Sequence, residues 1–348
     1  MSRHEIRGAV QSDEEELLRL AQHLNTVNLP NDRGHIQRLL EQSEKSFRGE
    51  LPERRRKYVF LLCDRATGAS LGTSTIVAQL GRRDAPYIYL DVIDEEKYSS
   101  ALDRHFHHTV LRIGFSYDGP TELGGLVVAP EHRNAPERLG LLISYVRFLF
   151  VATHRELFKN ELLAELLPPL EPDGTSHLWE ALGRRFTGMS YAEADLLSSE
   201  NKSFVRDLFP SGMIYASLLS PEAQGVIGKV GAQTRGVEKM MRRIGFRYAK
   251  RIDPFDGGPH FVATADEVSA VRETVRATVR FATPASGAGR ALVARDLAAP
   301  PYFRALVVPA LERDGSVELS SDVGAALGVS EGDAVAVLPL PLSGRGRD

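Results

Sequence analysis

The sequence predicts an α/β protein with a central mixed sheet flanked by helices. Three observations support this prediction. Segments with apolar residues at helical spacing are interspersed with short strand-like runs. A strand, a polar loop and a helix follow one another directly over residues 123–150. The length of 348 residues exceeds that of one typical domain and provides for a sizeable buried core in two or three parts.

The composition excludes several classes of partner. Lys and Arg total 43 against 46 Asp and Glu, a formal net charge of −3, so no basic excess exists to neutralise a run of phosphates. We therefore expect no nucleic-acid partner. The chain start lacks the apolar core of an export signal, and the most apolar stretch is short and interrupted by Arg147. The single cysteine, Cys63, has no disulfide partner, and together these features predict a cytoplasmic protein without a membrane span.

The first region is predicted to run helix, helix, strand, strand. Ser12 supplies a hydroxyl cap with Glu15 three residues later, before the apolar positions of a helix that reaches Leu24. Residues 33–47 carry a second helical pattern. The apolar run 58–63 and residues 71–80 are typical of strands.

The next region contains the most informative stretch. We expect a strand over 123–129, a polar loop over 130–137, a helix over 139–157 and a further strand over 162–167. Two later segments, 179–186 and 241–248, resemble each other, and each is predicted to be a helix ended by Gly and followed by a strand. This similarity indicates two related half-units, although chance also explains two copies of so short a pattern.

The character of the chain changes towards its end. A helix is expected over 267–279 and a flexible linker over 284–289, before a small β-rich module. Within that module we expect a turn at Asp314-Gly315, a helix over 322–327 and a strand over 334–338. We therefore predict three units: 1–190, 191–280 and 290–342.

The loop at 130–140 has features of an anion-binding site. A helix that begins directly after a strand and a loop presents free backbone N–H groups, which bind phosphates well. Arg133 and Arg138 add charged donors, and Gly140 permits close approach of an anion. This pattern indicates a pyrophosphate grip for coenzyme A, but an ordinary strand-to-helix connection explains it as well.

Several short stretches along residues 1 to about 262 form a recognisable pattern. They are Asn28-Leu29-Pro30, 58–62, Thr121-Glu122-Leu123, Pro130 with Arg133, 142–144 with 147–150, Ala164-Glu165, Phe204, Ile214-Tyr215, Ala223-Gln224 with 226–228, 245–248, and Asp253 with 255–259. In these stretches the chain is similar to the arginine N-succinyltransferase family, and its order of elements resembles the GNAT superfamily of acyl-CoA N-acyltransferases. The C-terminal module matches that family more loosely, at 327–329 and 331–333.

The resemblance implies a GNAT-like fold with a possible second partial GNAT-like unit, and transfer of a succinyl group from succinyl-CoA to the α-amino group of L-arginine or a related amine. It also implies an oligomer. The family's coenzyme-contacting leucine falls on Leu126 of the strand, where an ordinary core leucine is the alternative. With Leu126 we assign Val128 and Ser144 to coenzyme binding, beside the arginines and the glycine of the loop.

Two departures from the family pattern concern chemistry. The family's glycine-rich loop is replaced by residues 135–138, which leaves only Gly140 of a glycine pair. The family's proton-donating histidine corresponds here to Gly231, which cannot transfer a proton. The tyrosine that protonates the thiolate in many GNAT enzymes also has no counterpart, because Trp179 and Met241 occupy the equivalent places.

Attack of an amine on a thioester requires a free amine, stabilisation of the oxyanion and protonation of the leaving thiolate. Glu122, at the strand edge, is our first candidate for the general base; the alternative is a carboxylate that caps a loop or pairs with Arg133. Tyr145, with Ser144, is the candidate substitute for the missing proton donor, although a tyrosine on an apolar helix is more often a core residue.

Asp253 and Asp256 suit recognition of a cationic substrate, since a guanidinium favours bidentate carboxylate partners. A simple turn explains the same Asp and Gly residues equally well. His105, His107 and His108 lack a further ligand at recognisable spacing, so we expect exposed loop or helix histidines and no metal.

Two other functions remain open from the sequence. The first is an acyl-CoA-dependent N-acyltransferase with a different amine or acyl donor, which the absence of the family histidine favours. The second is a noncatalytic acyl-CoA-binding subunit that pairs with an active homologue.

Overall fold

A computed structural model describes residues 3–23, 29–83, 85–171, 173–282 and 289–342. In these ranges the strands form one sheet of 16 strands in the order β14-β15-β11-β16-β12-β13-β1-β2-β3-β6-β7-β10-β9-β4-β5-β8. The strands are β1 His4–Gly8, β2 Lys57–Asp64, β3 Ser70–Val77, β4 Tyr87–Ser99, β5 Arg104–Ser116, β6 Thr121–Val128, β7 Glu161–Glu165, β8 Ile214–Tyr215, β9 Arg247–Ile252, β10 Pro259–Thr264, β11 Val275–Phe281, β12 Arg290–Asp296, β13 Phe303–Pro309, β14 Leu311–Arg313, β15 Ser316–Leu319 and β16 Ala334–Leu340.

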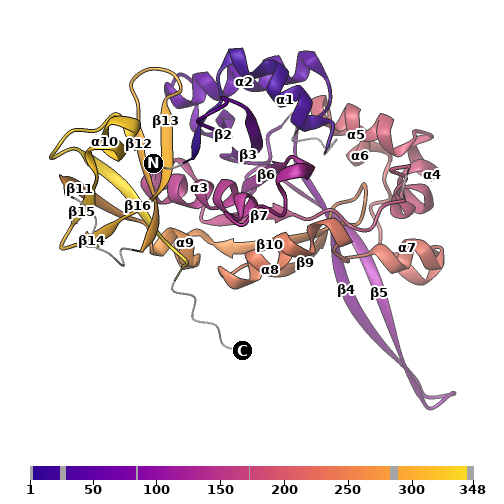
Figure 1. The fold of residues 1–348 in the computed structure, drawn as a ribbon. Coiled ribbons are helices and arrows are strands. Elements are labelled where there is room, and N and C mark those ends of the chain that lie inside the picture. Colours follow the sequence, from indigo (N-terminus) through magenta and orange to yellow (C-terminus); the bar gives the residue numbers. More distant parts are fainter. Residues whose placement is uncertain (1–2, 24–28, 84, 172, 283–288, 343–348) are drawn as a thin grey trace.

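Helices cover both faces of the central strands (Figure 1). They are α1 Glu14–Ala21, α2 Arg33–Phe47, α3 Leu139–Thr153, α4 Arg184–Thr187, α5 Tyr191–Glu200, α6 Ser203–Leu208, α7 Pro221–Val226, α8 Arg235–Arg243, α9 Ser269–Arg272 and α10 Ser321–Leu327. Strand β2 shows why two layers are needed. Its residues Val59 and Leu61 pack with α1 and α2, whereas Phe60 and Leu62 pack with α3. A strand buried on both faces reads as a continuous apolar run.

The predicted mixed sheet with flanking helices and a β-rich end is confirmed. The C-terminal strands enclose their own core around Val279, Val293 and Leu327. They also continue the main sheet, because β1 pairs with β13 on one side and with β2 on the other.

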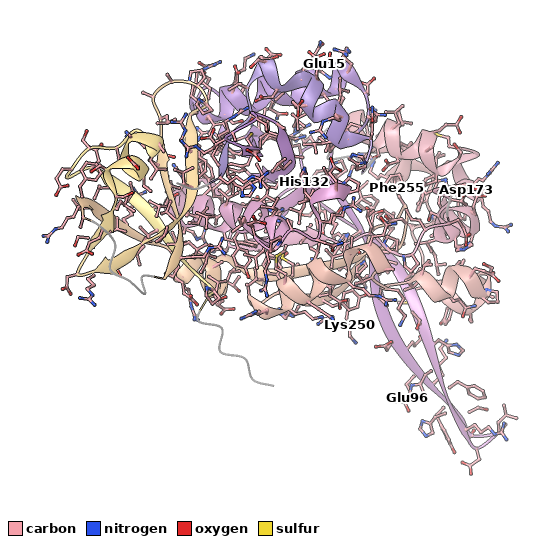
Figure 2. The ribbon with its side chains drawn as sticks, in the orientation of Figure 1. Glu15, Glu96, His132, Asp173, Lys250 and Phe255 are labelled. Atoms are coloured by element: carbon pink, nitrogen blue, oxygen red, sulfur yellow. The ribbon has the colours of Figure 1, made fainter. Side chains whose placement is uncertain are left out.

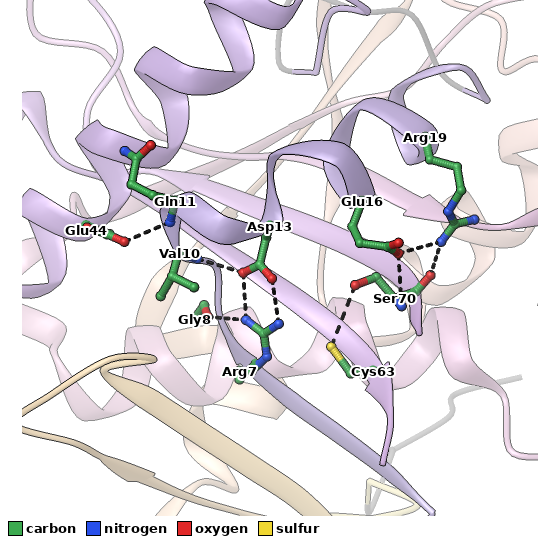
Figure 3. Close-up of polar contacts among 10 residues, drawn as sticks. All are labelled: Arg7, Gly8, Val10, Gln11, Asp13, Glu16, Arg19, Glu44, Cys63 and Ser70. Atoms are coloured by element: carbon green, nitrogen blue, oxygen red, sulfur yellow. Dashed lines mark hydrogen bonds and ion pairs between the residues drawn. The ribbon is translucent and has the colours of Figure 1, made fainter. Parts of the chain in front are cut away.

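The loop that leaves β1 is fixed by a largely buried ion pair, shown in Figure 3. Arg7 donates from both terminal nitrogens to the Asp13 carboxylate, at 2.7 Å each. Asp13 also accepts from the Val10 backbone N–H at 2.8 Å. The loop that leads from β1 to α1 is therefore held by one carboxylate.

Most predicted elements are present, but two of the predicted helices differ from the observed ones. The helix expected over 267–279 is only the short α9, after which β11 begins, because Ala277 and Val279 alternate with exposed neighbours as in a half-buried strand. The helix over 179–186 does not end at Gly183. The Trp179 ring covers Gly183, the helix ends at Gly188, and no strand follows there.

The longest strands were not predicted. Strands β4 and β5 form a hairpin that projects from the body (Figure 1), with Glu96 on its outer part in Figure 2. His105, His107 and His108 lie on β5, so the loop or helix that we expected there is wrong. His105 and His107 are exposed as predicted, whereas His108 is partly buried. The predicted linker lies outside the described residues except for Gly289. Among the described helices, none has the length and apolarity needed to cross a membrane.

Candidate active site

The candidate site is a cavity where two parallel strands separate. Strands β6 and β7 pair only at Thr121 with Leu162 and Glu122 with Leu163. Beyond that point β6 bends at Gly125, whose φ of +55° is readily adopted by glycine. The resulting gap contains a cavity of about 160 Å³, lined by β6, β7, α3, α5, α8 and the loop between β9 and β10. Beyond Glu122, the backbone of β6 is therefore not paired with β7.

Side chains of opposite charge reach this cavity from opposite faces of the sheet. Leu123 belongs to the core under α3, so the neighbouring Glu122 points to the other face. Glu165 shares that other face, because Ala164 packs under α3. Arg147 comes from α3 itself. The cavity therefore has an acidic side and a basic side.

The loop between β9 and β10 presents two carboxylates to the acidic side. Asp253 Oδ1 accepts the backbone N–H groups of Phe255 at 2.7 Å and Asp256 at 3.3 Å, and Asp256 Oδ1 accepts that of Gly258 at 2.7 Å. Phe255, labelled in Figure 2, stacks on Trp179 with ring centroids 5.0 Å apart. The predicted turn is present, and both Asp253 and Asp256 also line the cavity.

The carboxyl groups on the acidic side are crowded. Burial, followed by the charge of Asp253, raises the pKa of Asp195 on α5 to about 7 and raises the pKa of Asp256 well above its usual range. Burial also raises the pKa of Asp253. Like charges held close together in a desolvated cavity disfavour each other's ionised forms. A cationic ligand in the cavity would relieve this repulsion.

Glu165 connects the cavity to a buried histidine. The two residues face each other across β7 and β10, with His260 Nε2 3.4 Å from Glu165 Oε1. Tyr87 Oη lies 2.8 Å from His260 Nδ1. Burial, followed by the charges of Glu122 and Asp253, raises the pKa of Glu165 well above normal, and burial lowers the pKa of His260 to about 3. Both shifts favour a proton on the carboxyl group of Glu165 over one on the imidazole of His260.

One group of side chains has distances compatible with cation ligands. One oxygen each of Glu165 and Asp253 and one ring nitrogen of His260 lie within 4.8 Å of one another. Among the described residues, the three histidines of β5 belong to no such group.

Arg147 supplies the basic side. It is fully buried, and its guanidinium donates to the Gly124 carbonyl at 3.3 Å and to Ser144 Oγ at 2.8 Å. Burial lowers its pKa to about 9. Within the part of the chain that the structure describes, no carboxylate forms an ion pair with it.

The residues assigned to coenzyme binding are spread along β6 and the start of α3. Leu126 lines the cavity. Arg133 lies in the loop marked by His132 in Figure 2 and donates from Nε to the Val128 carbonyl at 3.1 Å. Arg138 precedes α3 with a left-handed φ of 57°, and Gly140 lies in the first turn. Ser144 is one turn deeper, where its hydroxyl accepts from Arg147.

The candidates for proton transfer are placed differently. Glu122 lines the cavity and is buried. Tyr145 lies in the core under α3, with its ring centroid 6.3 Å from that of Phe148, and is not a cavity residue. Gly231 packs against the segment after β7, with its N–H bonded to the Leu167 carbonyl at 2.9 Å. The structure thus brings Glu122 and the two aspartates together and leaves Tyr145 apart.

Four residues around this cavity had no role predicted from the sequence: Arg147, Glu165, Asp195 and His260. Arg147 carried a signal, because a lone arginine interrupts an otherwise apolar helix. His260 and Glu165 face each other only through pairing of distant strands, so no local pattern reveals them.

Comparison with known proteins gives matches along nearly the whole chain. The model of the arginine N-succinyltransferase beta subunit family matches residues 4–270, and the model of the C-terminal domain of that beta subunit matches 275–339. The arginine N-succinyltransferase of Escherichia coli O6:K15:H31 is 35% identical over 285 residues, which cover 81% of this chain and 82% of that protein.

Two Pseudomonas aeruginosa proteins are also similar. The arginine N-succinyltransferase subunit beta is 32% identical over 344 residues, covering 98% of this chain and 99% of that protein. The solved structure of arginine/ornithine succinyltransferase subunit AI superposes with a TM-score of 0.82 at 28% identity, covering 97% of this chain and 99% of the other. The whole architecture, with the β-rich module at its end, is shared with a solved protein.

Proposed function

The chain belongs to the arginine N-succinyltransferase beta subunit family, and on that premise we propose that it transfers a succinyl group from succinyl-CoA to the α-amino group of L-arginine. This reaction opens a route of arginine catabolism. The chain is accordingly an acyltransferase that uses a coenzyme A-linked acyl donor.

The observation that carries this proposal is the acidic side of the cavity between β6 and β7. Asp195, Asp253 and Asp256 line it, and none of the three forms an ion pair with a cation among the described residues. A guanidinium binds carboxylates bidentately and remains charged at all relevant pH values. We therefore assign Asp253 and Asp256, with Asp195 beside them, to the side chain of the acceptor. Ornithine, which the name of the solved relative includes, offers a shorter cation to the same groups.

We propose that the coenzyme binds at the end of the gap that lies away from the carboxylates assigned to the acceptor. The backbone of β6 at Leu126 and Val128 is suited to pair with the amides of the pantetheine arm. The start of α3, at Gly140, together with Arg133 and Arg138, offers N–H groups and charges to the pyrophosphate. Ser144 lies deeper on the same helix, and its proposed contact with the coenzyme requires that it share its hydroxyl with Arg147.

We propose direct transfer in a ternary complex. Glu122 takes a proton from the acceptor amine, directly or through water, so that the nitrogen lone pair can attack the thioester carbonyl. The tetrahedral intermediate then expels the thiolate. Tyr145, our predicted proton donor, lies in the core and does not line the cavity, so we propose that the thiolate takes its proton from water. Cys63 is buried, and burial raises the pKa of its thiol, so it is a poor nucleophile.

We also propose that the chain works in the cytoplasm as part of an oligomer. The names of two relatives describe them as subunits. The substrates, an amino acid and a coenzyme A thioester, are cytoplasmic metabolites.

The proposed reaction is tested by mass spectrometry. Purified protein is incubated with succinyl-CoA and L-arginine, and with acetyl-CoA, ornithine and other amino acids as competing pairs. N-succinylarginine is the expected main product. A different acylated amine would identify another N-acyltransferase, and coenzyme binding without any product would identify a noncatalytic subunit.

A further inference from the structure

Arg147 carries a buried charge in the middle of α3, where its side chain is fully enclosed. Taking a cation out of water is costly unless an anion compensates. Within the described residues no carboxylate forms an ion pair with Arg147, and its lowered pKa has burial as its cause. The protein thus maintains a desolvated cation whose partner is not part of the chain that the structure describes.

The hydrogen bonds of Arg147 leave a specific pair of donors available. Nε donates to the Ser144 carbonyl at 3.2 Å, Nη2 to Ser144 Oγ at 2.8 Å and Nη1 to the Gly124 carbonyl at 3.3 Å. A guanidinium has five N–H groups, so one N–H remains on each terminal nitrogen. One N–H group on each terminal nitrogen can donate to the two oxygens of a single carboxylate, which is the bidentate arrangement. The same bonds fix the orientation of the guanidinium.

The position of Arg147 indicates which substrate carries that carboxylate. Arg147 lines the cavity at Gly124, where β6 leaves β7, and it comes from the face that α3 covers. Glu122 and Glu165 lie on the opposite face. Carboxylates on that face repel an anion and attract a cation. An acyl group that enters the gap from the coenzyme side therefore meets Arg147, and a cationic acceptor meets the acids.

We propose that Arg147 binds the free carboxylate of a dicarboxylic acyl group and makes this chain select succinyl-CoA over neutral acyl thioesters. This inference rests on the proposed acyl transfer and names the residue that distinguishes its donor. Ser144 acts through Arg147, as a positioning residue.

The test compares two donors of equal carbon number, succinyl-CoA and butyryl-CoA, which differ by the carboxylate. Arg147→Met keeps an unbranched side chain and removes the charge. We expect kcat/KM for succinyl-CoA to fall about 100- to 1000-fold, as for truncation of one partner of a buried ion pair, while kcat/KM for butyryl-CoA stays the same or rises. Arg313→Met, on exposed β14, is the matched control and should leave both values unchanged.

Equal losses with both donors in a variant that melts like the wild type would show that Arg147 only supports the fold at Gly124, and would overturn the proposal. If Arg147→Met does not fold, calorimetric Kd values of the wild type for the two donors decide, because equal affinity also overturns it. These binding measurements do not require arginine. A wild type that prefers succinyl-CoA but makes no succinylarginine would refute the proposed acceptor and retain this inference.

Discussion

Removing one charge from the acidic side of the cavity, by Asp256→Asn, tests the assignment of the acceptor. Asp256 is 7% exposed, and its Oδ1 accepts the Gly258 N–H at 2.7 Å. An asparagine keeps an oxygen for that bond, so the turn is preserved and only the charge is lost. A hydrogen bond to a charged group contributes about 1.5–3 kcal/mol. We therefore expect KM for arginine to rise roughly 10- to 150-fold, with a smaller effect on kcat.

The assay measures initial rates with arginine and with citrulline, its neutral urea analogue. If Asp256 binds the guanidinium, the variant loses rate with arginine at low concentration and changes little with citrulline. The ratio of kcat/KM for arginine over citrulline should then fall by the same factor as the rise in KM. An unchanged ratio, or an equal loss with both acceptors, would refute the reasoning and leave Asp256 as a turn residue only.

Three further predictions concern other groups. Glu122→Gln should lower kcat by about 10²–10⁴-fold, the usual contribution of a general base, while the Kd for succinyl-CoA stays constant; unchanged turnover would remove its role. Burial raises the pKa of Asp195 to about 7, so its side chain becomes charged as the pH rises through 7. Calorimetry should therefore show that arginine binds more tightly at higher pH, and the affinity should depend less on pH in Asp195→Asn. Asp13→Ala should lower the free energy of unfolding by about 3–5 kcal/mol in urea titrations. Glu41→Ala, which removes only a surface pair with Lys45 whose side chains are 58% and 40% exposed, should leave the free energy of unfolding nearly unchanged; equal costs would contradict the argument.

The helices and strands around the cavity were predictable because their patterns are local. The run around Phe60 and Leu62 is apolar on both faces of the sheet, and α2 repeats its apolar residues at helical spacing. The hairpin was not predictable in this way. Residues on its outer part, such as Glu96 and His105, bond across the two strands and bury little apolar surface, so the alternation that identifies a half-buried strand is absent.

The candidate site was predictable in part. Glu122, Asp253 and Asp256 were assigned from the chemistry that arginine acylation needs, and the fold brings all three to one cavity. Tyr145 was assigned because it follows the loop in sequence, yet its turn of α3 faces the core. The position of a residue along a helix does not show whether its side chain faces the core or the cavity unless the layers packed against the helix are known. Those layers depend on the order of the strands, which cannot be predicted from local sequence patterns.

Gly231, where the family resemblance predicts a histidine, lies in a place that has no room for a side chain. A Cβ at this position would lie 2.6 Å from the Pro168 carbonyl oxygen, closer than real contacts allow. The segment after β7 packs directly on Gly231, so a side chain at this position would require that segment to lie farther away. Glu165 is the last residue of β7 and lines the cavity, and burial, followed by the charges of Glu122 and Asp253, raises its pKa well above its usual range. A raised pKa makes a carboxyl group a better proton holder than an ordinary glutamate, so Glu165 is the cavity residue that we propose to test, by Glu165→Gln, as the proton donor that Gly231 cannot be.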